Sequence, residues 1–174
     1  GDAEGSVESL VPVQDTSVAL RCKMSDPSTS LDGIKAVFLD LDGTIYLGSN
    51  LIEGAESFLS RLEESGIRRF FLSNNSSKSV GQYLEKLHGL GISASADEIL
   101  LSTHDLISWL RENSIDQTYL VGTEGMREML ESVDVNTESE NPQYVVLGYD
   151  TEITYEKLST ASIHLHRGVP MVSS

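Results

Sequence analysis

Two aspartates with one residue between them could support phosphoryl transfer. Asp40 and Asp42 follow an apolar run directly and precede Gly43 and Thr44. A carboxylate that ends a buried strand is costly unless it has a partner or a task, so the pair is a candidate for chemistry. Asp40 could attack a phosphorus atom and form an aspartyl-phosphate. Asp42 could give a proton to the leaving oxygen and later take one from the water that releases phosphate.

The residues around the pair could hold a phosphate group beside it. Gly43 allows a tight turn and a close approach of the backbone to a ligand, and the hydroxyl of Thr44 can orient the turn. We therefore include Leu41, Gly43 and Thr44 among the candidate phosphate-binding and substrate-binding residues. Mg²⁺ is the expected cofactor, because it accepts few protein oxygens together with water and phosphate. It would also screen Asp40 from an incoming anion.

Two other interpretations of this segment need no phosphoryl chemistry. Turns favour Asp and Gly for local reasons, so the segment could be an aspartate-rich turn with nothing bound. A calcium loop would need glycine at its sixth position and glutamate at its twelfth. Counted from Asp40, these positions hold Ile45 and Leu51, which excludes the calcium loop. The turn interpretation stays open at this point.

A second polar cluster, Ser73, Asn74 and Asn75, follows another apolar run. A hydroxyl, an amide and backbone N–H groups can together hold phosphate oxygens. The cluster could instead cap a helix through one of the serines at 76, 77 and 79, and both interpretations can hold because caps and anion sites use the same free N–H groups. Residues 74–76 also form a glycosylation sequon, which we discount at the end of a buried strand in a chain without a visible signal peptide.

Alternating strands and helices are expected to bring the two clusters together. The runs 34–39 and 69–72 are typical of strands, and the first is apolar on both faces, as in a sheet covered by helices. Helices are expected over about 55–65 and 80–87. This order predicts an α/β fold with a Rossmann-like parallel sheet, in which ligands bind at the carboxyl ends of the strands. Both clusters fall at such ends, so we treat them as one site.

The second half of the chain repeats the alternation. Strands are expected over 118–121, over 144–147 and from 169, and helices up to about 112, over 125–130 and over 155–166. The acidic stretch 134–142 is expected to be a solvated loop. Residues 1–31 mix Ser, Asp, Glu, Pro and Thr with short apolar pieces, which predicts a disordered N-terminal tail.

Composition limits the partners of this chain. It has 174 residues and a formal net charge of −15, which repels nucleic acid and anionic lipid. We expect a small phosphorylated metabolite as the partner, and neither nucleic acid nor a membrane. A single cysteine, Cys22, cannot form an internal disulfide framework. No signal peptide or membrane-length apolar run is visible, so a cytoplasmic location is expected.

The two clusters resemble the first two motifs of the haloacid dehalogenase (HAD) superfamily of phosphatases. Residues 40–46 match the first motif, and residues 71–76 match the second. Residues 145–150 and 155–158 are similar to the large cap domain of the subfamily that contains p-nitrophenyl phosphatases and NagD-type nucleotide phosphatases, and residues 122–125 resemble another cap stretch. The resemblance implies an incomplete HAD core over 32–103 and a partial α/β cap over 104–174, with a homodimer formed through the cap.

The resemblance also implies roles for individual residues. Asp40 would be the nucleophile, and its carboxylate would bind Mg²⁺. Asp42 would be the acid and base, and its main-chain oxygen would be a second metal ligand. Ser73 would contact phosphate, and Asn74 and Asn75 would line the entrance. The implied activity is Mg²⁺-dependent hydrolysis of a phosphomonoester.

The chain departs from the family pattern in one respect. The family also uses a lysine and a Gly-Asp segment that follow the cap, and neither Lys78 nor Lys157 is a good substitute for that lysine. We therefore expect a piece of a longer enzyme whose sheet has an exposed apolar edge. The alternative is a degenerate HAD-like binding module without catalysis. A phosphotransferase or mutase is less favoured, because a large cap of this type accompanies hydrolases in the family.

Overall fold

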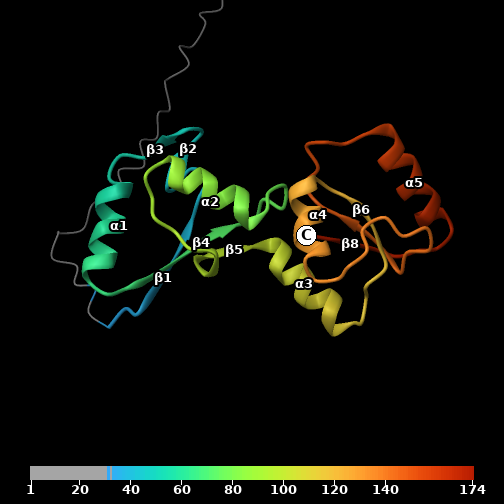
Figure 1. Cartoon of the computed structure of the whole chain (residues 1–174), viewed down its shortest axis with the longest axis horizontal. Coiled ribbons are helices and arrows are strands. Elements are labelled where there is room, and N and C mark those ends of the chain that lie inside the picture. The colour runs from blue at the N-terminus through green and yellow to red at the C-terminus, as the bar shows by residue number, and fades with distance from the viewer. Residues whose placement is uncertain (1–30, 32) are drawn as a thin grey trace, which may run out of the picture. The chain divides into compact units, whose positions relative to one another are not determined.

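The structure, a computed structural model, describes Leu31 and residues 33–174 (Figure 1). The disordered tail expected over 1–31 therefore lies outside the described residues, apart from Leu31. No helix in the described part of the chain has the length and apolar character needed to cross a bilayer.

The first sheet is parallel and has the strand order β1-β4-β5. A short antiparallel hairpin, β2 and β3, follows β1. The elements of this part are β1 (Ala36–Asp40), β2 (Tyr46–Leu47), β3 (Asn50–Leu51), α1 (Ala55–Glu64), β4 (Arg68–Ser73), α2 (Val80–Gly89), the 3₁₀ turn η1 (Ala96–Glu98) and β5 (Ile99–Leu101).

Amphipathic spacing and capping explain the two helices that position the site. Helix α1 buries Leu59 and Leu62, three residues apart on one face. Helix α2 begins after Ser79, whose hydroxyl accepts the backbone N–H of Gln82 at 3.4 Å. The Gln82 side chain accepts the N–H of Ser79 in return at 2.9 Å, which completes a capping box. The start of α2, and with it the direction of its side chains, is therefore fixed by local sequence.

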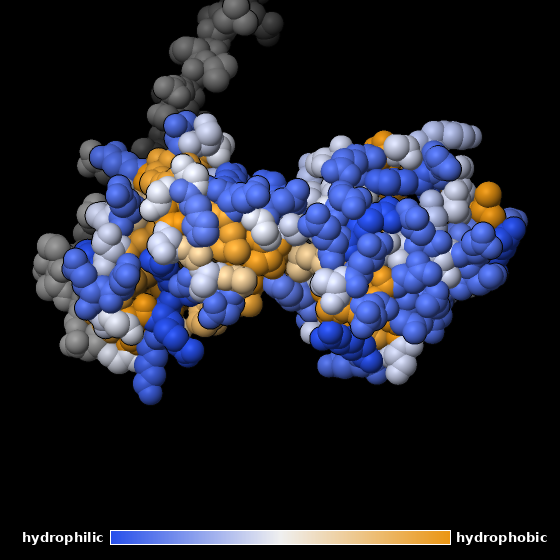
Figure 2. All heavy atoms as spheres, in the orientation of Figure 1, coloured by the Kyte–Doolittle hydropathy of each residue, from blue (hydrophilic) through white to orange (hydrophobic). Residues whose placement is uncertain are grey.

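Strand β1 is an edge strand of the described sheet, and the expectation that it would be buried on both faces is wrong. Phe38 is 61% exposed and Leu72 on β4 is 37% exposed. Both crossovers, β1 to β4 and β4 to β5, step in the same direction, so right-handed connections put α1 and α2 on one face. The other face carries exposed apolar side chains, and Figure 2 shows apolar surface in this region.

The second sheet is also parallel, with the order β6-β7-β8. Val121, Val145 and Ala161 form a buried cluster between this sheet and α5. The α/β class with parallel sheets predicted from the sequence is confirmed. The elements of this part are α3 (Ser102–Glu112), β6 (Thr118–Val121), α4 (Glu124–Glu131), β7 (Tyr144–Leu147), α5 (Tyr155–His166) and β8 (Met171–Ser173).

The acidic stretch 134–142 is not simply a solvated loop. Val135, Thr137 and Ser139 are buried, at 4%, 1% and 8% exposure. The backbone N–H of Thr118 donates to the carbonyl oxygen of Asn136 at 2.8 Å, so the stretch runs along the edge of β6. Its residues alternate between buried and exposed, as in an extended segment against a sheet. The acidic side chains occupy the outward positions.

The segment after β4 connects the first sheet to the second. The hydroxyl of Thr123 donates to the carbonyl oxygen of Ser77 at 2.7 Å. The hydroxyl of Ser76 accepts the N–H of Tyr149 at 2.9 Å. A Cβ at Gly125 would lie 2.8 Å from the backbone nitrogen of Ser79, so only glycine allows this close approach. Two of the serines considered as helix caps therefore have different roles. Ser79 caps α2, and Ser76 binds the loop that follows β7.

Candidate active site

The turn after β1 fixes the two aspartates by backbone bonds. The N–H groups of Ile45 and Tyr46 both donate to the carbonyl oxygen of Leu41, at 3.0 and 3.3 Å. The N–H of Gly43 donates to the carbonyl oxygen of Tyr46 at 2.8 Å, and Gly43 has a φ of 87°, which favours glycine. Leu41 is fully buried and anchors the turn. Asp40 and Asp42, on either side of it, are exposed.

Asp40 lies at the tip of β1, where Thr44 holds its carboxylate. The Thr44 hydroxyl donates to Oδ2 of Asp40 at 3.2 Å. This bond fixes the orientation of an exposed carboxylate that could otherwise rotate. Thr44 therefore contacts the carboxylate of the proposed nucleophile directly.

Asp42 has different partners, one for each carboxylate oxygen. The Tyr46 hydroxyl donates to Oδ2 at 3.4 Å, and the Lys86 ammonium lies 3.7 Å from Oδ1. The same ammonium lies 3.7 Å from the centre of the Tyr46 ring. Burial raises the pKa of Tyr46 above its ordinary value, and the negative charge of Asp42 adds to the shift. Burial lowers the pKa of Lys86, and the neighbouring Lys78 lowers it further.

Ser73 ends β4 and is held from two directions. Its hydroxyl lies 2.7 Å from the hydroxyl of Tyr83, a fully buried residue of α2. The N–H of Asn75 donates to the Ser73 oxygen at 3.2 Å, and the Asn75 side chain accepts the N–H of Ser77 at 2.9 Å. Asn74 is exposed, and its carbonyl oxygen accepts the Ser102 hydroxyl at 3.5 Å.

The structure brings the aspartates and the Ser-Asn cluster to one edge of the sheet. Asp40 pairs with Leu72 across the parallel strands, and Ser73 is the next residue along. Neighbouring strands lie roughly 4.8 Å apart. Tyr83 contacts Ser73 from α2. Burial raises the pKa of Tyr83, its hydrogen bond with Ser73 opposes this shift, and the negative charges of Asp42 and Asp40 add to it.

Three site residues were not assigned roles from the sequence: Tyr46, Tyr83 and Lys86. Tyr46 belongs to the first motif, but nothing in the motif says that its hydroxyl would reach Asp42. Tyr83 and Lys86 lie three residues apart, which places them on one face of α2. That spacing is the one signal that could have linked them, because it aims both toward the strand ends. Two lysines were weighed above as substitutes for the family's later lysine. The Lys78 ammonium lies 5.4 Å from the centre of the Tyr83 ring, and the Lys157 ammonium binds Asp150, in the loop that follows β7.

The donor set of this edge fits Mg²⁺ in type. Mg²⁺ prefers hard oxygen ligands and usually keeps several waters. The exposed Asp40 carboxylate is such a ligand. The side-chain oxygens of Asp42 already have Tyr46 and Lys86 as neighbours, which suits a contact through its main-chain oxygen. Within residues 31 and 33–174, no three or more His, Cys, Asp and Glu side chains are grouped so that they could hold a metal ion.

Comparison with known proteins decides the family. The family model for haloacid dehalogenase-like hydrolases matches residues 37–136. The chain belongs to this family. The match begins within β1 and includes both polar clusters, so the resemblance predicted from the sequence is confirmed.

Curated relatives and solved structures support the same family. An acid sugar phosphatase of Staphylococcus saprophyticus is 37% identical over 142 residues, which are 80% of this chain and 55% of the relative. The crystal structure of a 4-nitrophenylphosphatase from Thermotoga maritima matches with a TM-score of 0.77 and 34% identity, over 82% of this chain and 55% of that one. NagD from Escherichia coli K-12 shares the fold, with a TM-score of 0.72 at 20% identity, over 80% of this chain and 56% of that one.

These haloacid dehalogenase-like relatives are longer than the chain. It spans about half the length of the curated relatives that it matches. The p-nitrophenyl phosphatase and NagD-like subfamily predicted from the sequence is confirmed by two solved structures that are each 34% identical to the chain, a putative NagD protein and the Thermotoga maritima 4-nitrophenylphosphatase.

Proposed function

We propose that this chain carries the nucleophile half of a Mg²⁺-dependent phosphomonoester hydrolase that works through an aspartyl-phosphate. The observation that carries the proposal is the exposed Asp40 carboxylate at the tip of β1, one strand away from the Ser73 hydroxyl. The names of two relatives, acid sugar phosphatase and 4-nitrophenylphosphatase, support phosphatase chemistry. The substrate class is a small phosphorylated metabolite, with sugar phosphates favoured by the first of these names.

The reaction has two displacements at phosphorus. In the first, an oxygen of Asp40 attacks the phosphorus atom, the bond between phosphorus and the ester oxygen breaks, and that oxygen takes a proton from Asp42. In the second, a water molecule attacks the aspartyl-phosphate and gives a proton to Asp42. The bond between phosphorus and Asp40 breaks, which releases inorganic phosphate and restores both carboxyl groups.

The surrounding residues hold the phosphoryl group between these steps. The Ser73 hydroxyl and the backbone N–H groups of the turn can bind its oxygens, with Leu41, Gly43 and Thr44 on one side. Asn74 and Asn75 would line the entrance. When bound to the Asp40 carboxylate and the Asp42 main-chain oxygen, Mg²⁺ supplies positive charge that offsets the repulsion between the aspartates and the substrate.

We further propose that residues 32–103 are the N-terminal part of the family's core and residues 104–174 part of its cap. The two separate sheets support this division, since the first ends at Leu101 and the second begins at Thr118. The remaining phosphate-binding and metal-binding groups would then come from outside this chain's residues in the full-length protein. The homodimer through the cap and the cytoplasmic location stay predictions.

Substitution of Asp40 tests the nucleophile. The full-length protein should hydrolyse 4-nitrophenyl phosphate with Mg²⁺ and lose activity with EDTA. Asp40→Asn should lower kcat by on the order of 10⁴-fold or more, as loss of a nucleophile does in other hydrolases. Asp105→Asn, the same change at an exposed position of α3, is the matched control and should retain activity.

Circular dichroism separates loss of catalysis from loss of fold, and Asp40→Asn should leave the spectrum unchanged. Near-normal turnover by Asp40→Asn would show that the nucleophile is assigned wrongly. If the wild-type protein bound phosphate without turnover, the binding-module alternative would replace the hydrolase.

A further inference from the structure

We propose that Tyr46 and Lys86 are positioning residues that hold the Asp42 carboxylate for proton transfer. This inference rests on the proposed function, and it adds two residues to the site. Each binds a different oxygen of Asp42: the Tyr46 hydroxyl at 3.4 Å from Oδ2, and the Lys86 ammonium at 3.7 Å from Oδ1. An exposed carboxylate on a turn would otherwise rotate among several conformations.

The two partners come from different elements and support one another. Tyr46 lies on β2 and Lys86 on α2, and the ammonium lies over the Tyr46 ring at 3.7 Å from its centre, within cation–π range. Asp42, Tyr46 and Lys86 therefore form a closed set of three contacts. Displacing any one of them disturbs the other two.

Tyr46 provides a rigid base for this set. Its side chain is fully buried, its backbone N–H donates to Leu41, and it pairs with Leu51 in the β2-β3 hairpin. The side chain of Lys86 is 25% exposed, whereas that of Asp42 is 54% exposed. The carboxylate thus faces solvent, where a leaving group could meet it, while its partners approach from the protein side.

The arrangement differs from an ordinary surface ion pair. A lone exposed pair is screened by water and holds neither side chain in place. Here a buried hydroxyl and a partly buried ammonium converge on one carboxylate, and Asp40 is held separately by Thr44. The two carboxylates of the motif therefore have separate supports, which matches their separate roles. Proton transfer depends steeply on such alignment.

The leaving group distinguishes positioning of the acid from a structural role. Phenyl phosphate and 4-nitrophenyl phosphate have similar shapes, but nitrophenolate is a much weaker base than phenolate and needs less help from an acid. Loss of alignment at Asp42 should therefore harm phenyl phosphate more. The quantity to measure is kcat/KM for both esters with the full-length protein, because this constant reports the steps up to ester cleavage.

We expect Tyr46→Phe and Lys86→Met to lower kcat/KM for phenyl phosphate about tenfold more than for 4-nitrophenyl phosphate, a fraction of the total effect of a general acid. Lys86→Arg keeps a cation in place and should restore most of the ratio. Lys35→Met removes a lysine just before β1, at the end of that strand opposite the aspartates, and should leave both constants unchanged.

Equal losses on the two esters, or no loss on either, would overturn the positioning role. Circular dichroism checks the fold, and if Tyr46→Phe unfolds, the Lys86 pair of variants decides the question by itself. The wild-type protein and Asp40→Asn run in the same assay keep the two proposals apart. Wild-type turnover that Asp40→Asn abolishes supports the hydrolase whatever the ratio shows, whereas absence of wild-type turnover overturns the hydrolase and the positioning role together.

Discussion

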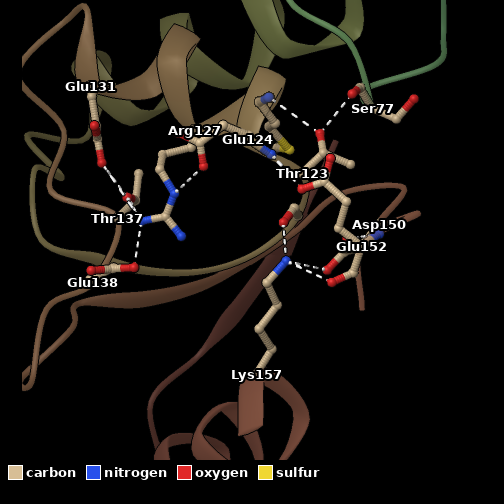
Figure 3. A network of polar contacts seen from close by, with 12 residues as sticks. Ser77, Thr123, Glu124, Arg127, Glu131, Thr137, Glu138, Asp150, Glu152 and Lys157 are labelled. Atoms are coloured by element: carbon tan, nitrogen blue, oxygen red, sulfur yellow. Dashed lines mark hydrogen bonds and ion pairs between the residues drawn. The ribbon is translucent and has the colours of Figure 1, made fainter. Parts of the chain in front are cut away.

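Lys157 should contribute strongly to stability, because it neutralises a buried carboxylate in the second sheet (Figure 3). Its ammonium donates to Oδ2 of Asp150 at 3.1 Å, to the carbonyl oxygen of Gly122 at 2.7 Å and to that of Glu152 at 3.2 Å. The Asp150 side chain is 2% exposed and that of Lys157 is 20% exposed. The ammonium therefore joins α5 to the ends of β6 and β7 through three bonds.

Lys157→Met keeps most of the side-chain volume and removes the charge. Asp150 then retains the N–H of Glu152, which donates to Oδ1 at 2.7 Å, but loses its only cation among the described residues. Breaking a buried pair from one side costs about 3–5 kcal/mol. We expect about 3 kcal/mol, the lower end, because the Glu152 N–H bond remains and Lys157 is partly exposed.

Fluorescence of the single tryptophan reports this region specifically. Trp109 packs edge-on against Tyr144, the first residue of β7, with ring centres 5.3 Å apart. Urea unfolding followed by this signal should give the free energy of unfolding of the second sheet. Glu124→Gln is the matched control, because Glu124 pairs with Arg127 at the surface, where such a pair contributes at most about 1 kcal/mol.

A double-mutant cycle tests the reason for the loss. Adding Asp150→Asn to Lys157→Met removes the stranded charge and should recover about 1 kcal/mol, with a coupling energy of about 2 kcal/mol. If Lys157→Met cost less than about 1 kcal/mol, or if the two changes were additive, the carboxylate would not depend on Lys157 and the argument would be refuted.

Two further predictions concern the first sheet. His104 accepts the N–H of Leu101 through Nδ1 at 3.1 Å, and burial lowers the pKa of His104. The stability that His104 contributes is therefore complete above about pH 6.5 and is lost as the pH falls from there through the lower pKa of the folded state. His104→Gln should make the free energy of unfolding, measured with urea, depend less on pH in this range, and an unchanged pH dependence would contradict the prediction. Tyr83→Phe removes the hydroxyl partner of Ser73, which should cost phosphate binding about 1 kcal/mol. The inhibition constant of inorganic phosphate should therefore rise about fivefold. An unchanged inhibition constant would show that Tyr83 does not orient Ser73.

The sequence was sufficient to predict what depends on local pattern. Apolar runs of strand length predicted the strands around the site, and the rule that ligands bind at carboxyl strand ends predicted that Asp40 and Ser73 would share one edge, where the strand register places them. The expectation for β1 was wrong because burial of a strand depends on its neighbours. A run that is apolar on both faces has the composition of a central strand, yet within the described residues β1 has one neighbour and one covered face.

The partners of Asp42 could not be predicted in the same way, because they depend on where a helix lies across the sheet. Lys86 follows Asp42 by more than forty positions in the sequence. The two side chains meet because α2, which follows β4, places Lys86 near the carboxyl ends of the strands. The sequence motif contains the groups proposed to react, whereas the side chains that position these groups belong to other helices and strands. In this chain the capping box at Ser79 fixes the first turn of α2. The helical period then places Tyr83 and Lys86 on one face of α2, where Tyr83 contacts Ser73 and Lys86 contacts Asp42. The start of α2 thus helps to align both polar clusters. A substitution at Ser79 or Gln82 would therefore shift Tyr83 and Lys86, although neither substituted residue contacts an aspartate.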